Sequence, residues 1–142
     1  MEMEKLIRYS SRQKALDHAL WLTFIHRVKG QKYGAILSIE GDYLVVPIDH
    51  PTFEGEPFEQ LPVSYSNISF TDIGQIRQDA EQLSHWEELL GAFSVMDGQL
   101  LRFILEYRVD LEKLIRYELA ARGHDKDGKW CGFEKAAEIW LT

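Results

Sequence analysis

The spacing of apolar residues predicts a helix over residues 11–29. Apolar side chains in this segment recur every three or four positions, which places them on one face of an α-helix, and Gly30 follows as a stop signal. Trp21 and its neighbours widen this face. We therefore expect the helix to pack on a sheet on one side and on a second element or subunit on the other.

The pattern then changes to short runs rich in β-branched and aromatic residues. Two of them, 33–39 and 43–48, are separated by the turn sequence Glu40-Gly41-Asp42, which predicts a β-hairpin. A third strand is predicted within residues 63–70, where Val63 and Tyr65 are two positions apart.

The rest of the chain has helical spacing. A first helix is predicted from a cap at Thr71 or Asp72 to about Leu83. Residues Ser84 to Glu87 then have the Ser-x-x-Glu form of a capping box, in which the two side chains satisfy backbone N–H groups at the helix start. A second helix is therefore expected from about residue 85.

Apolar residues between positions 100 and 114 continue at steps of three and four. They predict one long helix, or two helices bent at Val109-Asp110, ending at Gly123. A short last helix is expected over residues 133–141.

Together these elements predict an α+β fold, with an N-terminal helix, a small antiparallel sheet of about three strands, and a C-terminal group of three or four helices packed on it. A chain of 142 residues suits one hydrophobic core, and no repeat or linker divides it. We therefore predict a single globular domain over residues 1–142.

Composition favours a soluble cytoplasmic protein. Cys131 is the only cysteine, so no intramolecular disulfide can form. The first residues lack the basic and apolar regions of a secretory signal, and no apolar run reaches the ~18 residues of a membrane span. We predict no membrane association.

Charge is distributed unevenly along the chain. The net charge is −7, and residues 34–106 hold thirteen acidic side chains but only two basic ones. Such a segment repels phosphate backbones, so nucleic-acid binding is disfavoured. It favours a basic protein as the partner.

All four prolines fall between Pro47 and Pro62, which predicts a long irregular loop. Within it, acidic residues alternate with aromatic residues that could anchor a partner inside a negative rim. Our leading hypothesis is a non-enzymatic interaction module, of the inhibitor or adaptor type, that engages a basic protein through its acidic middle segment, residues 34–106. The predicted partner-binding residues are Phe53, Glu54, Glu56, Phe58 and Glu59.

The alternative hypothesis is a small enzyme or ligand-binding domain with a pocket near the 47–62 loop. Asp49, His50 and Glu54 could transfer protons there if the fold brings them together, although adjacent residues of an extended chain point opposite ways. No nucleophile motif or nucleotide-binding glycine loop is present, so an enzyme is the less favoured class and no cofactor is predicted.

Residues 123–134 have the outline of a calcium-binding loop. Asp125, Asp127 and Glu134 would occupy its third, fifth and twelfth positions. The first ligand position, however, is Gly123, which has no side chain. We predict no metal, and interpret the segment as a helix end followed by an Asp-Gly turn.

Large aromatic residues are abundant, with four Trp, six Tyr and seven Phe. Trp21 and Trp140 lie within apolar stripes and are assigned to the core, whereas Trp86 and Trp130 are expected to be partly exposed. The two most apolar helices offer more surface than a small sheet covers, so a homodimer is also predicted.

Overall fold

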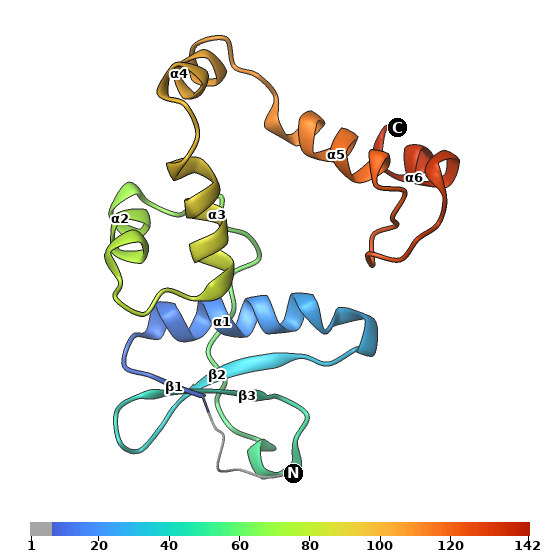
Figure 1. The fold of residues 1–142 in the computed structure, drawn as a ribbon. Helices are drawn as coiled ribbons and strands as arrows, with labels where there is room; N and C mark the ends of the chain where they lie inside the picture. The colour runs from blue at the N-terminus through green and yellow to red at the C-terminus, as the bar shows by residue number, and fades with distance from the viewer. Residues whose placement is uncertain (1–6) are drawn as a thin grey trace. The chain divides into compact units, whose positions relative to one another are not determined.

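The computed structural model describes residues 7–142, which form two compact units divided between Ala92 and Phe93. Each unit is considered by itself, and the single-domain organisation stays a prediction. Figure 1 shows the order of the elements along the chain. The first unit contains β1 (Ile7–Tyr9), α1 (Arg12–Ile25), η1 (Arg27–Lys29), β2 (Tyr33–Leu37), β3 (Tyr43–Pro47), η2 (Pro51–Phe53), α2 (Phe70–Gln78) and the start of α3 (Ser84–Ser94). The second contains α4 (Gly98–Glu106), α5 (Leu111–Ala121) and α6 (Phe133–Trp140).

The three strands form one antiparallel sheet in the order β1-β3-β2. The predicted hairpin is confirmed as β2 and β3. The predicted strand over residues 63–70 is wrong, because this segment is irregular and α2 begins at Phe70. Val63 is 98% exposed, and so contributes nothing to a sheet face. The third strand is instead β1, whose three residues are too few to show an alternating pattern.

Helix α1 begins at the N-cap Ser11, whose side chain accepts a hydrogen bond from the Lys14 backbone N–H. One face of α1 packs on the sheet and forms the first hydrophobic core. Its small residues allow the helix to approach the strands closely. The core residues are Ala15, Leu16, Ala19, Ala35 and Val45. The helix ends at Ile25, and a separate 3-10 turn, η1, fills the rest of the predicted span up to Gly30.

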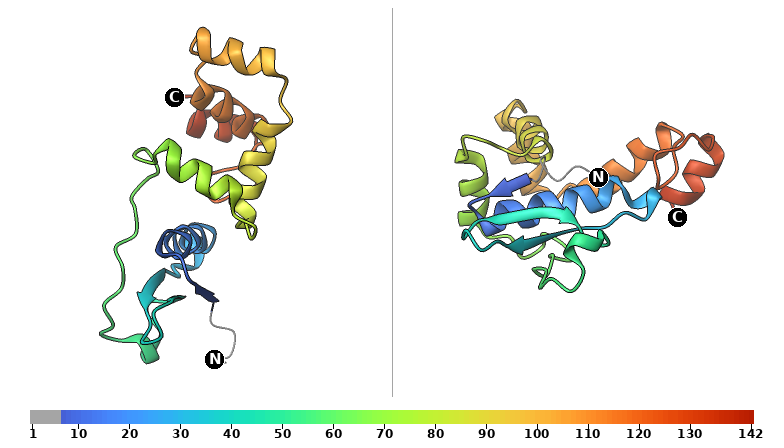
Figure 2. Two further views of the ribbon diagram at one scale, coloured as in Figure 1. Left: turned by 90° about the vertical axis from the view of Figure 1, so that its left-hand side faces the viewer. Right: turned by 90° about the horizontal axis from the view of Figure 1, so that it is seen from below.

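The opposite face of the sheet is covered by the proline-rich loop. Phe53 is 6% exposed and packs against Ile36, Leu44 and Val46, with Phe58 beside them. The loop is tied to the edge of β2 by a hydrogen bond of 2.7 Å from the Glu59 N–H to the Ala35 carbonyl. Figure 2 shows the chain then running back past the sheet toward α2. The first unit is therefore layered, with the loop on one face of the sheet and α1 on the other.

Helix α2 starts with a capping box one turn earlier than the sequence pattern indicated. The Ser69 side chain accepts from the Asp72 N–H, and the Asp72 carboxylate accepts from the Ser69 N–H. The box predicted at Ser84 is wrong, since Ser84 already lies inside α3 and the Glu87 N–H donates to the Leu83 carbonyl.

The long apolar stretch after residue 97 is divided into two helices, as one of the two alternatives predicted. Arg108 adopts a left-handed conformation (φ 52°) between α4 and α5, which an α-helix does not tolerate. Asp110 caps α5 by accepting from the Lys113 N–H at 3.2 Å. The fold class is confirmed as α+β, with five helices after the sheet in the described chain instead of three or four.

Helices α5 and α6 are joined by a tightly bonded turn. Gly123 has φ 69° and lies directly under the Trp130 ring, where a Cβ atom would come within 2.3 Å of the indole. The Trp140 indole donates to the His124 carbonyl at 2.8 Å. These contacts fix the geometry of the turn within the second unit.

None of the helices formed by residues 7–142 combines the length and the apolar character that crossing a membrane requires.

Substitution of Gly34 by alanine tests how closely the loop packs on the sheet. A Cβ atom at this position would lie 2.7 Å from Ile48 Cγ2 and from Phe58 Cδ1, so the loop or the strand must shift. We expect Gly34→Ala to lower the free energy of unfolding by about 1–3 kcal/mol in urea denaturation.

The matched control is Gly74→Ala in α2, where a Cβ atom meets nothing within 4 Å. It should be neutral or stabilising by up to about 1 kcal/mol, because alanine favours helix more than glycine does. Equal stability of both variants would contradict the packing of the loop on β2.

Candidate functional site

A buried carboxylate lies at the centre of the first unit. Asp17, on the face of α1 that points away from the sheet, is only 2% exposed. Its Oδ1 atom accepts hydrogen bonds from the Tyr65 hydroxyl at 2.8 Å and from Gln13 Nε2 at 2.9 Å. Both donors are neutral. Asp17 is therefore a buried charge held by hydrogen bonds without a described ion pair.

Burial dominates the electrostatics of this group and raises the pKa of the Asp17 carboxyl. The hydrogen bonds from Tyr65 and Gln13 act in the opposite direction because they favour the ionised form. The Trp86 indole also favours the ionised form, although its Nε1 atom makes no hydrogen bond of regular geometry. Burial and the adjacent Asp17 together raise the pKa of the Tyr65 phenol.

Aromatic rings cover this carboxylate and join α3 to α1. The His85 imidazole stacks on the Trp21 indole with the ring centroids 4.9 Å apart and the planes at 15°. Tyr65 meets Trp86 edge to face at 5.3 Å. Both ring nitrogens of His85 are buried and have no hydrogen-bond partner within residues 7–142. The start of α3 is therefore held on α1 by aromatic stacking, and the His85 ring adds no hydrogen bond to this contact.

A second histidine lies on the same side of α1. The Tyr9 hydroxyl and His18 Nδ1 are 2.5 Å apart, which links β1 to the helix. Burial lowers the pKa values of both His18 and His85. The proximity of His18 lowers the pKa of His85 further. Both imidazoles are thus favoured in the neutral form.

Clefts surround this group of side chains. Two, of about 350 and 470 Å³, share Trp21, Tyr65 and His85 in their walls. Another, of about 400 Å³, is lined in part by residues 60–65, at the end of the proline-rich loop. These volumes fall within the range of small-ligand pockets. The Asp17 cluster is therefore a candidate binding site, because it combines concave surfaces with shifted pKa values.

The sequence interpretation missed this cluster. Its members come from positions 17, 65 and 85, in three separate segments, and only the fold brings them together. One local signal was present. Asp17 lies between Gln13, Leu20 and Trp21 on a single helix face, so a carboxylate interrupts an otherwise largely apolar surface.

The structure divides the predicted partner-binding residues into two groups. Phe53 is buried in the core and Phe58 is half-buried beside it, so both position the loop and Phe53 has almost no surface left for a partner. Glu54 and Glu56 are exposed. Glu59 pairs with Arg12, with Arg12 Nε and Glu59 Oε1 2.6 Å apart.

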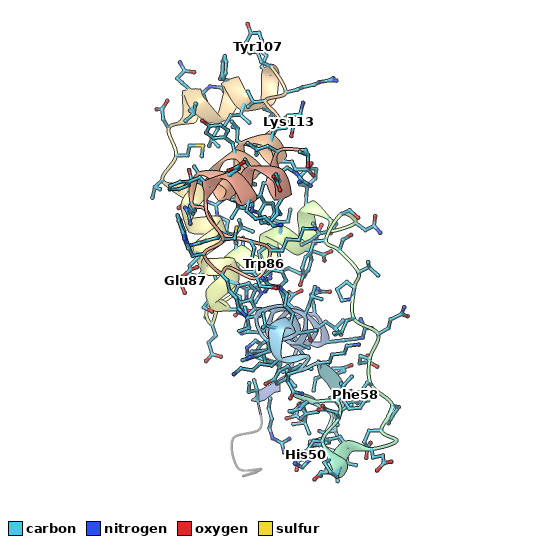
Figure 3. The ribbon with its side chains drawn as sticks, turned by 90° about the vertical axis from the view of Figure 1, so that its right-hand side faces the viewer. His50, Phe58, Trp86, Glu87, Tyr107 and Lys113 are labelled. Atoms are coloured by element: carbon cyan, nitrogen blue, oxygen red, sulfur yellow. The ribbon has the colours of Figure 1, made fainter. Side chains whose placement is uncertain are left out.

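The alternative pocket residues do not bind one another. The Asp49 carboxylate accepts from Gln31 Nε2 at 2.9 Å, whereas His50 Nδ1 accepts from the Thr52 N–H at 3.1 Å and caps η2. Glu54 makes no hydrogen bond or ion pair with either. Figure 3 shows His50 and Phe58 on the side of α1 opposite to Trp86.

The calcium-like segment forms a self-contained turn. The Asp125 carboxylate accepts from the backbone N–H groups of Asp127 and Lys129, at 2.9 and 3.0 Å. Glu134 lies in the first turn of α6. No group of three His, Cys, Asp or Glu side chains able to hold a metal occurs among residues 7–142.

The four tryptophans were only partly assigned correctly. Trp130 is 62% exposed, as predicted. Trp86 is only 8% exposed, so the prediction that it is partly exposed is wrong. Its place at the start of a helix indicated exposure, but Tyr65 and α1 cover the ring. Trp21 and Trp140 are half-buried.

Comparisons of this chain with protein-family models, with curated proteins and with solved structures find no match.

Removal of the Tyr65 hydroxyl tests the Asp17 cluster. Tyr65→Phe takes one donor from a buried carboxylate, and we expect a loss of about 1.5–3 kcal/mol of unfolding free energy at neutral pH. The loss should shrink as the pH falls through the raised pKa of Asp17, because the neutral carboxyl depends less on this donor. Urea denaturation at several pH values measures both effects.

Tyr43→Phe is the control, since the Tyr43 hydroxyl makes no hydrogen bond with any of residues 7–142. It should change the unfolding free energy by less than about 0.5 kcal/mol at every pH. A similar loss of unfolding free energy in both variants would show that the Tyr65–Asp17 hydrogen bond does not stabilise the fold.

Proposed function

We propose that this protein is a non-enzymatic interaction module that engages a basic protein through the acidic loop over residues 51–59. The main support for the proposal is that Glu54 and Glu56 are exposed and form no ion pair with any described residue. Three other acidic side chains of the first unit are neutralised locally by a basic side chain. Glu59 pairs with Arg12, Asp42 with Arg8 and Asp79 with Lys14. The charge of the two loop glutamates therefore remains available to a partner.

The anchoring of the loop supports the same function. Phe53 and Phe58 pack on the sheet, and η2 is capped by His50. Glu54 follows Phe53 directly, so its backbone is held by a buried neighbour. A loop that is ordered before binding loses less conformational entropy on association.

The pocket hypothesis at Asp49, His50 and Glu54 has less support, because the first two side chains bind separate partners. The proposal includes a cytoplasmic location. It rests on the single cysteine, which suits a reducing compartment.

The test compares two variants of equal charge in partner capture from native lysate. In Glu54→Gln/Glu56→Gln the unfolding free energy should be nearly unchanged, because both side chains are exposed and unpaired. A basic protein retained by the wild type at low salt should be lost by this variant and should leave the wild type as the salt concentration rises. Mass spectrometry identifies the protein and its stoichiometry.

The control is Glu87→Gln/Glu106→Gln, which removes the same charge from α3 and α4. It should retain the partner. If the two variants retain the same proteins equally, net charge and not the loop governs binding, and the assignment of the loop is wrong.

Self-association is a compatible part of the proposal. In the second unit α4 exposes apolar side chains, with Leu100 48% and Phe103 53% exposed. We expect a dimer in light scattering at high protein concentration, and Leu100→Glu/Phe103→Glu should shift it to the monomer. A monomeric mass of the wild type at every concentration would contradict the predicted homodimer.

A further inference from the structure

We propose that His85 acts as a pH-sensitive latch, which holds α2 and α3 against α1 at neutral pH and releases them in mildly acidic solution. The latch is the stacked contact between the His85 and Trp21 rings, and it lies entirely within the first unit. It is independent of the acidic loop, which lies on the opposite face of the sheet.

The environment of the ring makes protonation incompatible with the latched position. Both ring nitrogens of His85 are buried and have no hydrogen-bond partner in the described part of the chain. A neutral imidazole tolerates this at moderate cost, but an imidazolium ion carries two N–H donors and a charge. Burial of an unpaired charge costs far more than burial of an unpaired neutral group. The protonated ring is therefore stable only after it leaves the Trp21 stack and reaches water.

The neighbouring charged groups do not compensate for this. From α1, His18 adds a second imidazole, whose proximity lowers the pKa of His85 further. Asp17, also on α1, already accepts from Tyr65 and Gln13, and no bond links it to His85. Tyr65, from the irregular segment before α2, is neutral and donates to Asp17. On α3 itself, Glu88 lines the cleft beside His85 but reaches neither buried nitrogen.

Few other polar contacts hold α2 and α3 on α1. The Lys14–Asp79 ion pair, with Lys14 Nζ and Asp79 Oδ2 3.2 Å apart, links α1 to the turn after α2. Trp86 packs against Tyr65. The Lys14 side chain is 15% exposed and that of Asp79 36%, so this pair is partly buried. The aromatic layer that His85 completes is the second attachment, and it is the one that a proton on His85 would disrupt.

The direction of the pH effect follows from linkage. Burial lowers the pKa of His85 below its free value of about 6.5, so the released state binds the proton more tightly than the latched state. At pH values well above 6.5 the His85–Trp21 contact contributes its full stabilisation. The contribution is lost as the pH falls below about 6.5 toward the lowered pKa of the latched ring.

Hydrogen exchange followed by mass spectrometry tests the proposal on the intact protein. After correction for the intrinsic rate, peptides covering residues 70–92 should exchange several-fold faster at pH 5.5 than at pH 7.5, because the opened state binds the His85 proton more tightly than the latched state. Peptides covering α1, β2 and β3 should keep their protection. Uniform protection at both pH values, or equal loss over the whole first unit, would overturn the latch.

Three variants assign the effect to His85. His85→Phe keeps an aromatic ring on Trp21 but cannot be protonated, so the exchange of residues 70–92 should lose its pH dependence. His50→Asn removes an imidazole elsewhere, retains a capping side chain, and should behave as the wild type. His18→Gln removes the imidazole that lowers the pKa of the latched His85, so the acceleration of exchange between pH 7.5 and pH 5.5 should be smaller than in the wild type.

If His85→Phe fails to fold, His18→Gln and the wild type still decide the question. Persistence of the full pH dependence in His85→Phe, or an equal acceleration of exchange in His18→Gln and the wild type, would show that other groups control the opening.

Discussion

The burial of α1 on two opposite sides is the constraint on which the rest of the first unit depends. Ala15, Leu16 and Ala19 pack on the sheet, and Trp21 contacts the aromatic layer from α3 on the other side. A helix covered on both sides must carry apolar residues around most of its surface. The one charged residue of this buried surface, Asp17, is accommodated because Tyr65 and Gln13 donate to it.

The sheet is likewise covered on both faces, by α1 on one face and by the proposed interaction loop on the other. Each strand residue that points away from α1 needs cover, and in a three-stranded sheet there is no second helix layer to provide it. Phe53 and Phe58 supply the cover from the loop. The loop is thereby ordered, and its glutamates gain fixed positions as a consequence of core formation. Stability and the proposed binding function therefore share the same anchor residues.

The two sides of α1 differ in how strongly they are held. The sheet side combines backbone pairing with a hydrophobic core, whereas the other side depends on stacked rings and on His85, whose buried ring nitrogens have no hydrogen-bond partner among residues 7–142. Local stability is expected to follow this difference, since segments with few buried apolar contacts open first. This asymmetry is what allows a proton to act on α2 and α3 and leave the sheet intact.

The sequence by itself determined the α+β class, the hairpin, the positions of the helices and the negative charge of the loop. These depend on periodicity, turn residues and composition, which are local properties. The short strand β1 and the capping box at Ser69 escaped notice because three residues, or a Ser-x-x-Asp pair, carry a weak local signal. Only the tertiary structure decided that Phe53 and Trp86 are buried and that Asp17, Tyr65 and His85 converge. Such contacts join residues distant in the chain, and no pattern along one dimension records which side chains the folded backbone brings together.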